Sequence, residues 1–212
     1  MTGLIVYGTG AEQAWPDMSA LARRLLALMA SATKAAVAHE PCATEHVDER
    51  DRQFVEVVRA HEATIAAICF SYAGKVAEYD DLRQDALVNI WRGLASFRAE
   101  ASMKTWVYRV VLNSCVSTIR RMARYGRESE SLEGLYALVD EPSDKREQVE
   151  TLHRLLATLG AEDRAIMVMW LDEASYDEIG AVMGMGRNTV ATRIRRAKER
   201  MAKFASNEKT GL

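Results

Sequence analysis

A concentrated group of basic side chains lies near the end of the sequence, between Arg187 and Arg200. This stretch holds six basic residues and a single acid, Glu199, although the whole chain of 212 residues has a net charge of −2. Arginine can pair in bidentate fashion with the edge of guanine, and asparagine can do the same with adenine. Arg187, Asn188 and Arg193 are therefore the best candidates for reading DNA bases. Three further basic residues are candidates for phosphate contacts or plain solvated charge: Arg195, Lys198 and Arg200.

The residues around this basic group have the spacing of a helix-turn-helix. A helix over 175–183 is followed by Gly184-Met185-Gly186, a turn in which glycine tolerates a left-handed backbone, and a second helix opens at Asn188 or Thr189. The N-terminal end of such a second helix enters the major groove of duplex DNA. The alternative interpretation is a basic helix that is merely a solvated face. The residues expected to face the core are Tyr176, Ile179, Ala181 and Val182 in the first helix and Val190, Ile194 and Ala197 in the second.

A second basic segment covers 101–127 and holds six basic residues and no acid. Phe97, Trp106 and Tyr108 lie beside its cations, a combination that suits unstacked bases and single-stranded backbone. The alternative places Trp106 and Tyr108 in the core, and the phase of Trp106 with Val110 favours the core for Trp106. Between the two basic segments, residues 128–150 contain eight acids and two bases. The charge is therefore segregated along the chain rather than evenly mixed.

Helices must position these segments, because only the short GLIVYG near the start alternates like a strand. The sequence predicts an all-α fold of two small helical domains joined by an acidic linker, the C-terminal domain being the helix-turn-helix. Amphipathic helices are expected over 19–38, 48–72, 78–97, 102–124, 145–159, 161–173, 175–183 and 187–205. The 78–97 helix should bury Leu82, Ala86, Ile90 and Leu94, and the 102–124 helix should bury Trp106, Val110 and Ile119.

The cysteines and the apolar segments limit the class of protein. Three widely spaced cysteines form no disulfide framework, no apolar run reaches transmembrane length, and the start does not resemble a secretory signal. A soluble, cytoplasmic protein is expected. His39, Cys42 and His46 have a spacing that could suit zinc, but they lack a fourth ligand and a CxxC pair. We therefore expect no metal site and no cofactor.

Two long segments carry a family resemblance. DDLRQDALVNIWRGLASFRAEASMKTWVYRVVLNSCVSTIRR resembles the second region of bacterial RNA polymerase sigma factors of the extracytoplasmic-function (ECF) group of the sigma-70 family. LGAEDRAIMVMWLDEASYDEIGAVMGMGRNTVATRIRRAKERM resembles the fourth region of the same group. The order of the two, and the acidic linker in place of a third domain, also match. The resemblance covers about residues 48–206 and is more specific for the pair than for either half.

The resemblance implies a non-enzymatic sigma factor that binds core RNA polymerase, recognises minus-thirty-five and minus-ten promoter elements, and starts transcription. Promoter DNA, as duplex and as melted single strand, is the second partner, and an anti-sigma factor or other regulator is expected. The implied organisation is an extension over 1–47, a polymerase-binding and minus-ten domain over 48–124, a linker over 125–144 and a minus-thirty-five domain over 145–212.

The resemblance also assigns residues to three surfaces. The surface for core polymerase comprises Asp81, Leu82, Gln84, Asp85 and Trp91. The minus-ten surface comprises Lys104, Thr105, Trp106, Tyr108, Arg109, Asn113, Arg120 and Arg121. The minus-thirty-five surface comprises Arg187, Asn188, Thr189, Thr192, Arg193 and Arg196. Ser117 stands where relatives often have Asp and Leu112 where they often have Arg, so promoter preference at the minus-ten element is open.

Other interpretations of the sequence remain. Residues 1–47 have no counterpart in a minimal member of the group, so they are either a regulatory helix or the product of a start codon upstream of the real one, with Met18 as a candidate. A stand-alone helix-turn-helix regulator would bind operators as a dimer without polymerase. An enzyme is disfavoured, because the acid cluster of Asp80, Asp81 and Asp85 and that of Glu173, Asp177 and Glu178 come with no nucleophile or histidine.

Overall fold

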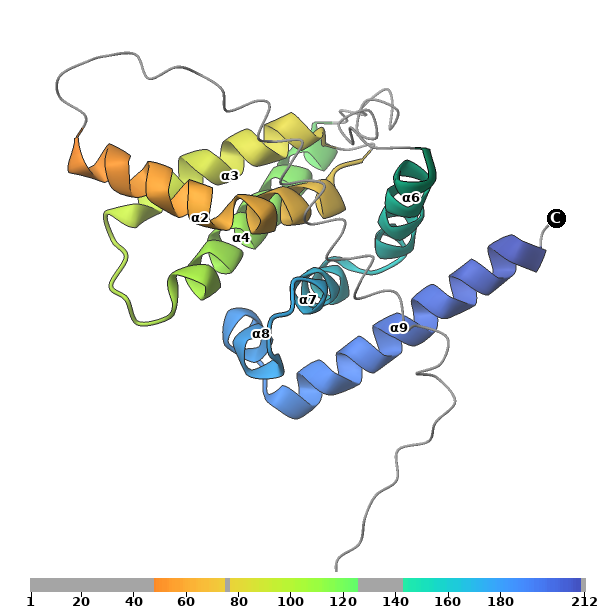
Figure 1. Ribbon diagram of the computed structural model, residues 1–212. Helices are drawn as coiled ribbons and strands as arrows, with labels where there is room; N and C mark the ends of the chain where they lie inside the picture. The colour runs from red at the N-terminus through yellow and green to blue at the C-terminus, as the bar shows by residue number, and fades with distance from the viewer. Residues whose placement is uncertain (1–47, 75–76, 126–142, 211–212) are drawn as a thin grey trace, which may run out of the picture.

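The computed structural model describes residues 48–74, 77–125 and 143–210, which are almost entirely helical (Figure 1). The first group of helices comprises α2 (Glu49–Tyr72), α3 (Tyr79–Leu94) and α4 (Met103–Arg124). The second comprises α6 (Ser143–Ala157), α7 (Ala161–Leu171), α8 (Tyr176–Met183) and α9 (Arg187–Thr210). Within these residues the only strand-like pairing is an isolated bridge between Gly74 and Ala77. The prediction of an all-α fold is confirmed.

Several predictions from the sequence fall on residues outside the described part of the chain. These are the helix at 19–38, the possible start at Met18, the zinc-like set of His39, Cys42 and His46, and nearly all of the 125–144 linker. They remain predictions.

The first domain is a three-helix unit in which α2, α3 and α4 all contact one another. α3 buries a single stripe, and its four members are those predicted from helical spacing: Leu82, Ala86, Ile90 and Leu94. Opposite them, α2 contributes Ile65 and Ile68, which have no exposed surface. The apolar stripe of α3 therefore fixes which of its residues are left outside for a partner.

The buried face of α4 lies one residue away from the predicted face. Trp106, Val110 and Ile119 are only half-buried, because α4 carries two adjacent apolar rows and the row beside theirs meets the core. Trp106 packs at the rim instead, with its ring centroid 5.3 Å from that of Phe97. The row that is buried comprises Val107, Val111, Cys115, Thr118 and Met122.

The second domain is the predicted helix-turn-helix, supported by α6 and α7. α8 opens with a capping box, in which the Ser175 hydroxyl accepts from the Glu178 backbone N–H and the Glu178 carboxylate accepts from the Ser175 backbone N–H. Gly184 ends α8 with φ of 68°, a left-handed conformation that favours glycine. α9 begins at Arg187, as expected for the 187–205 helix, and buries Val190, Ile194 and Ala197 as predicted.

The sequence predicts that Ala181 faces the core, and the structure corrects this, because the close approach inside the helix-turn-helix is made by Gly180. Ala181 is exposed, whereas Gly180 is buried and a Cβ at Gly180 would lie 2.6 Å from the carbonyl oxygen of Met185. That oxygen belongs to the backbone of the turn, so it cannot move aside as a side chain could. The missing side chain of Gly180 therefore lets the turn fold back against α8.

Gly180→Ala should destabilise the helix-turn-helix by about 1–3 kcal/mol, the usual cost of forcing an extra methyl group into a packed site. In a chain of this size that corresponds to a fall in Tm on the order of 5 °C, measurable by circular dichroism. Gly74→Ala is the control, because a Cβ at Gly74 has nothing within 4 Å and its φ is not left-handed. Equal melting curves for the two variants would refute this explanation of Gly180.

The two domains lie against each other, with α7 packed on α2 and α4, α8 on α4 and α6 on α2 (Figure 1). At the end of α2 the hydroxyl of Tyr72 donates to the carbonyl of Ala161 over 2.6 Å. Arg164 of α7 donates to the carbonyl of Ser71 over 3.2 Å. These contacts hold the C-terminal end of α2 against the start of α7. Among the described helices, none has the length and apolar character needed to cross a membrane.

His153 of α6 is buried at this junction and should make stability depend on pH. Its Nε2 lies 2.9 Å from the carbonyl oxygen of Ala73, its ring meets Phe70 edge-on, and burial lowers its pKa despite that hydrogen bond. The folded protein therefore keeps His153 neutral below the ordinary pKa of about 6.5, where the unfolded chain takes up a proton.

The contribution of His153 to the free energy of unfolding should be fully present above about pH 6.5. It should fall as the pH drops towards the lowered pKa of His153. We expect a loss of a few degrees in Tm between pH 7 and pH 5.5, on the order expected for one buried histidine. His153→Gln should flatten part of that slope, and the rest belongs in part to His61, whose pKa is also lowered by burial. A slope that His153→Gln leaves unchanged would contradict the assignment.

Candidate nucleic-acid and polymerase interfaces

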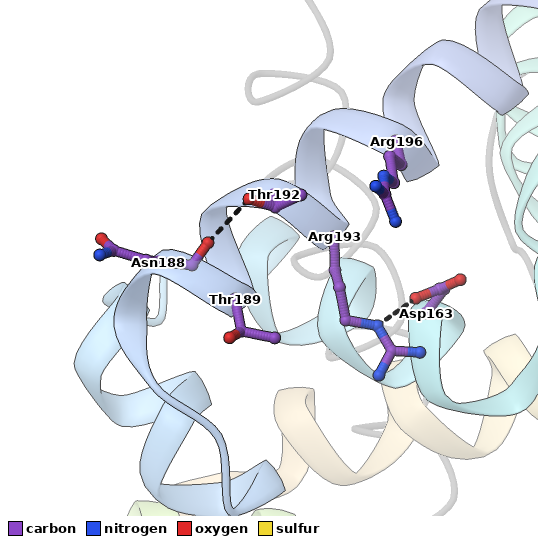
Figure 2. A pocket seen from close by; sticks show the side chains of 6 residues that line it. All are labelled: Asp163, Asn188, Thr189, Thr192, Arg193 and Arg196. Carbon is purple, nitrogen blue, oxygen red and sulfur yellow. Dashed lines mark hydrogen bonds and ion pairs between the residues drawn. The ribbon is translucent and has the colours of Figure 1, made fainter.

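The N-terminal half of α9 presents polar side chains around a pocket on the outside of the second domain. Figure 2 shows the pocket, with Asn188, Thr192 and Arg196 on successive turns of α9 and with Asp163 of α7 beside Arg193. The Thr192 hydroxyl donates to the carbonyl of Asn188 over 2.9 Å, so it is turned along the helix. The full lining is Asp163, Asn188, Thr189, Thr192, Arg193 and Arg196. Five of the six residues assigned to the minus-thirty-five surface thus meet at one place.

The arginines of this surface differ in how strongly they are held. Arg193 makes two ion pairs with α7, from Nη1 to Glu162 and from Nε to Asp163, each of 2.7 Å, and these hydrogen bonds raise its pKa (Figure 2). Arg187 pairs with Asp177 of α8 over 2.6 Å, but both side chains are well exposed. Arg196 is exposed and has no ion-pair partner among the described residues. Arg196 can therefore meet DNA without first breaking a contact, and Arg193 cannot.

The minus-ten surface is divided over several sides of α4. Asn113 and Arg120 are exposed, and Trp106 is half-buried at the rim. Thr105 is buried, with its hydroxyl 2.8 Å from that of Ser102, the residue that caps the helix. Arg121 pairs with Asp85 of α3 over 2.6 Å. The remaining three residues, Lys104, Tyr108 and Arg109, are directed at the second domain.

Tyr108 is the buried aromatic residue of α4, and Trp106 is the more exposed one, although the sequence favoured the core for Trp106. The side chain of Tyr108 is 2% exposed and its hydroxyl donates to the carboxylate of Asp172 in the loop after α7. Lys104 lies 3.3 Å from the same carboxylate, and Arg109 donates to the carbonyl of Ala181 in α8. Nothing in the spacing of the sequence pointed to Asp172, because its partners are more than 60 positions away.

The predicted polymerase surface lies on the outer side of α3. Asp81 and Gln84 are exposed, but Leu82 is fully buried and can act only by supporting the helix beneath them. Asp85 accepts from Thr118 and Arg121, each over 2.6 Å, and these contacts lower its pKa although burial opposes them. Part of the acid cluster noted in the sequence is therefore neutralised within the protein.

Trp91 forms an exposed aromatic site at the other end of α3. It is 39% exposed, the guanidinium of Arg50 stacks 3.8 Å from its ring centroid, and its Nε1 donates to Asp51 over 3.1 Å. Arg50 also donates to the backbone carbonyl of Trp91 over 2.9 Å. These contacts hold the indole in one orientation. The role of Arg50 could not be predicted from the sequence, because Arg50 of α2 and Trp91 of α3 are 41 positions apart and meet only in the folded protein.

Family comparisons match both domains. The family model for Sigma-70 region 2 matches residues 57–125, and that for Sigma-70, region 4 matches residues 150–201. The ECF RNA polymerase sigma factor SigM of Mycobacterium tuberculosis (strain ATCC 25618 / H37Rv) is 29% identical over 172 residues, 79% of this chain and 84% of SigM. RNA polymerase sigma factor YlaC of Bacillus subtilis (strain 168) is 31% identical over 129 residues, 58% of this chain and 75% of YlaC. The chain belongs to the ECF group of the sigma-70 family.

This sigma factor therefore promotes transcription initiation, and the alternative of a stand-alone regulator is set aside because both sigma regions are present in one chain. Members of the family are initiation factors rather than enzymes, and their partners are core RNA polymerase and promoter DNA. Within the described residues no group of three or more His, Cys, Asp and Glu side chains could hold a metal ion.

Solved structures share the fold of this sigma factor. CnrH in complex with the cytosolic domain of CnrY matches with a TM-score of 0.56 and 21% identity, over 88% of this chain and 98% of CnrH. The sigma factor RpoE in complex with the anti-sigma factor NepR, from Bartonella quintana, matches with a TM-score of 0.57 and 21% identity, over 76% of this chain and 98% of RpoE. At this level of identity the likeness concerns the helical fold alone.

Proposed function

We propose that this sigma factor docks on core RNA polymerase through α3, captures the melted minus-ten element with α4, and reads the minus-thirty-five element with α9. The observation that carries the proposal is the surface at the start of α9, where Asn188, Thr192 and Arg196 face outward from a capped helix-turn-helix. A helix presented in this way fits the major groove, and its asparagine and arginine carry the donors that adenine and guanine edges accept.

The two kinds of contact on α9 have different tasks. Asn188 and Arg196 are the proposed base readers, because the structure gives their side chains no competing partner among the described residues. Arg187 can exchange its exposed pair with Asp177 for DNA at small cost, since exposed ion pairs contribute little. Arg193 has a positioning task, because its two ion pairs bind α9 to the start of α7.

On α4, the proposed minus-ten contacts combine cations with aromatic rings. Lys104 and Arg109 would contact the backbone phosphates of the melted strand, and the half-buried Trp106 offers a ring on which an unpaired base can stack. The ring of Tyr108 would join it only after its contact with Asp172 is broken. Asn113 is exposed on the same helix, and Arg120 and Arg121 follow towards its C-terminus. Thr105 supports the start of α4 through Ser102 rather than by touching DNA.

The proposal extends to the setting in which the protein works. Residues 48–124 would form the polymerase-binding and minus-ten domain, 125–144 the acidic linker and 145–212 the minus-thirty-five domain. A cytoplasmic location follows from partnership with RNA polymerase and the bacterial chromosome. An anti-sigma factor that contacts both domains is proposed as the controlling partner, since the sigma factor RpoE, which shares this fold, is in complex with the anti-sigma factor NepR in its solved structure.

The test is promoter binding with and without core polymerase. Two modest DNA contacts become strong when polymerase holds both domains on one template, because the second contact then forms at high effective concentration. Fluorescence anisotropy should give tight, specific binding of promoter fragments by the holoenzyme, and weak binding by the sigma factor alone. Equally tight binding without core polymerase would contradict the proposed division of labour.

A further inference from the structure

Asp172 is the meeting point of three side chains from the other domain. Its Oδ2 accepts a hydrogen bond from Thr64 of α2 over 2.9 Å and another from the hydroxyl of Tyr108, and it lies 3.3 Å from Nζ of Lys104. The side chain of Asp172 is only 13% exposed. One carboxylate thus joins the end of α7 to both α2 and α4, and hydrogen bonds to an ionised acceptor are stronger than those between neutral groups.

Two of these three donors belong to the proposed minus-ten surface. Burial, followed by the adjacent Asp172, raises the pKa of Tyr108, so its hydroxyl stays protonated and continues to donate. Lys104 also donates to the backbone carbonyl of Asp172 over 3.4 Å. A ring buried in this way cannot stack on an unpaired base. The ammonium of Lys104 must leave the carboxylate of Asp172 before it can pair with a phosphate.

A third member of the surface is engaged by α8. Arg109 donates to the carbonyl of Ala181, which lies in the last turn of α8. Carbonyls in the last turn of a helix lack partners within the helix, and the negative end of the helix dipole adds to their attraction for a cation. The first helix of the helix-turn-helix therefore holds the guanidinium of Arg109, although that side chain stays exposed.

The closed arrangement cannot serve both promoter elements at once. The minus-thirty-five and minus-ten elements lie about 25 base pairs apart, which is roughly 85 Å of B-form DNA at 3.4 Å per base pair. In the structure α4 and α8 are in direct contact. The 17 residues numbered 126–142 can span up to about 60 Å when extended, so the length of the chain allows the domains to part.

We propose that the Asp172 clasp, defined as Asp172 with Thr64, Lys104 and Tyr108, is an autoinhibitory contact that keeps the minus-ten surface of the free sigma factor against its own second domain. The carboxylate of Asp172 occupies the position beside Lys104 that a phosphate of the melted strand would take. Binding to core polymerase separates the domains and breaks the clasp. This inference rests on the proposed function of α4.

Two variants test the clasp in the full chain. Thr64→Val removes one hydrogen bond without changing charge, volume or any residue of the proposed DNA surface. Asp172→Asn removes the ionised acceptor of all three contacts. Glu150→Gln is the matched control, because it removes one negative charge and an ion pair of 3.3 Å with Arg146 from the same domain, within α6. Thermal melts check that each variant folds. If Asp172→Asn does not fold, the result for Thr64→Val decides whether the clasp exists.

Two readouts are measured on the free protein. Energy transfer between dyes at Gln53→Cys in α2 and Lys203→Cys in α9, with Cys42→Ser, reports the separation of the domains; both positions are exposed, and Cys69 and Cys115 are buried. Anisotropy with a fluorescein-labelled pool of short single-stranded oligonucleotides of random sequence reports access to α4. We expect lower energy transfer for both variants, with affinity about threefold higher for Thr64→Val and about tenfold higher for Asp172→Asn.

Glu150→Gln should leave both readouts at the wild-type values. Wild-type energy transfer in both clasp variants would overturn the inference, and tighter DNA binding without that change would assign the effect to local charge and overturn it equally. Run-off transcription by wild-type protein with core polymerase is measured in parallel. Absence of promoter-specific transcripts would refute the proposed function, whereas normal transcripts with an unchanged domain separation in the variants would refute the clasp alone.

Discussion

Trp91→Ala should lower the affinity of the sigma factor for core RNA polymerase by about 30-fold or more. Trp91 is 39% exposed and held in one orientation by Arg50 and Asp51, and Val88, one turn earlier on α3, is also 39% exposed. An exposed tryptophan held in one orientation is the type of residue that dominates binding when a partner buries it, and its truncation then costs about 2 kcal/mol or more. Titration of labelled protein with core polymerase measures the effect.

The change should leave the fold intact, because the indole is at the surface and its stacking with Arg50 is worth only about 0.5–1 kcal/mol. Phe204→Ala is the control, since Phe204 is a comparably exposed aromatic residue, at 37%, on α9 of the other domain. It should change core affinity by less than about twofold. If both variants bind core polymerase as the wild type does, α3 is not the docking helix.

Arg196→Ala should reduce binding of the holoenzyme to promoter DNA by about tenfold or more. The guanidinium of Arg196 projects into the pocket of α9 and has no ion-pair partner among the described residues, so its loss removes a DNA contact and leaves no acid uncompensated (Figure 2). A good bidentate base contact is worth about 1–3 kcal/mol. Transcription from promoters that depend on the minus-thirty-five element should fall in proportion.

Arg200→Ala is the matched control for Arg196→Ala. Arg200 has the same charge and lies one turn further along the same helix, outside the pocket. It should lower affinity by about twofold and equally for all sequences, as expected for a solvated charge or a phosphate contact. Equal losses in the two variants would mean that α9 attracts DNA by charge alone and does not read the minus-thirty-five element.

Much of this architecture follows from local patterns in the sequence. The stripe of Leu82, Ala86, Ile90 and Leu94 is buried as predicted, because α3 has a single apolar row and helical spacing then leaves no choice. The turn at Gly184 and the buried Val190 and Ile194 of α9 were predictable for the same reason. The pattern of the helix-turn-helix is confined to some 30 consecutive residues, so it can be recognised without knowledge of distant contacts.

The remaining features depend on contacts in the folded protein that the spacing of residue types along the chain does not show. α4 has two apolar rows, and only the packing of α2 and α3 determines that Val107 rather than Trp106 is buried. Gly180 and Ala181 are both small, and only the position of the Met185 carbonyl shows which of them must lack a side chain. From the sequence, Asp172 is an ordinary acid at the end of a helix. Only the fold shows that it contacts Thr64, Lys104 and Tyr108 of the other domain.

The central claim is tested most directly by sequencing the 5′ ends of RNA made on genomic DNA by core polymerase with and without this protein. Our account predicts a set of start sites that appear only with the protein and share two upstream sequence elements, one for α4 and one for α9. Arg196→Ala should weaken the sites with the poorest minus-ten match first, since those depend most on α9. A set of start sites identical to that of core polymerase alone would contradict the account.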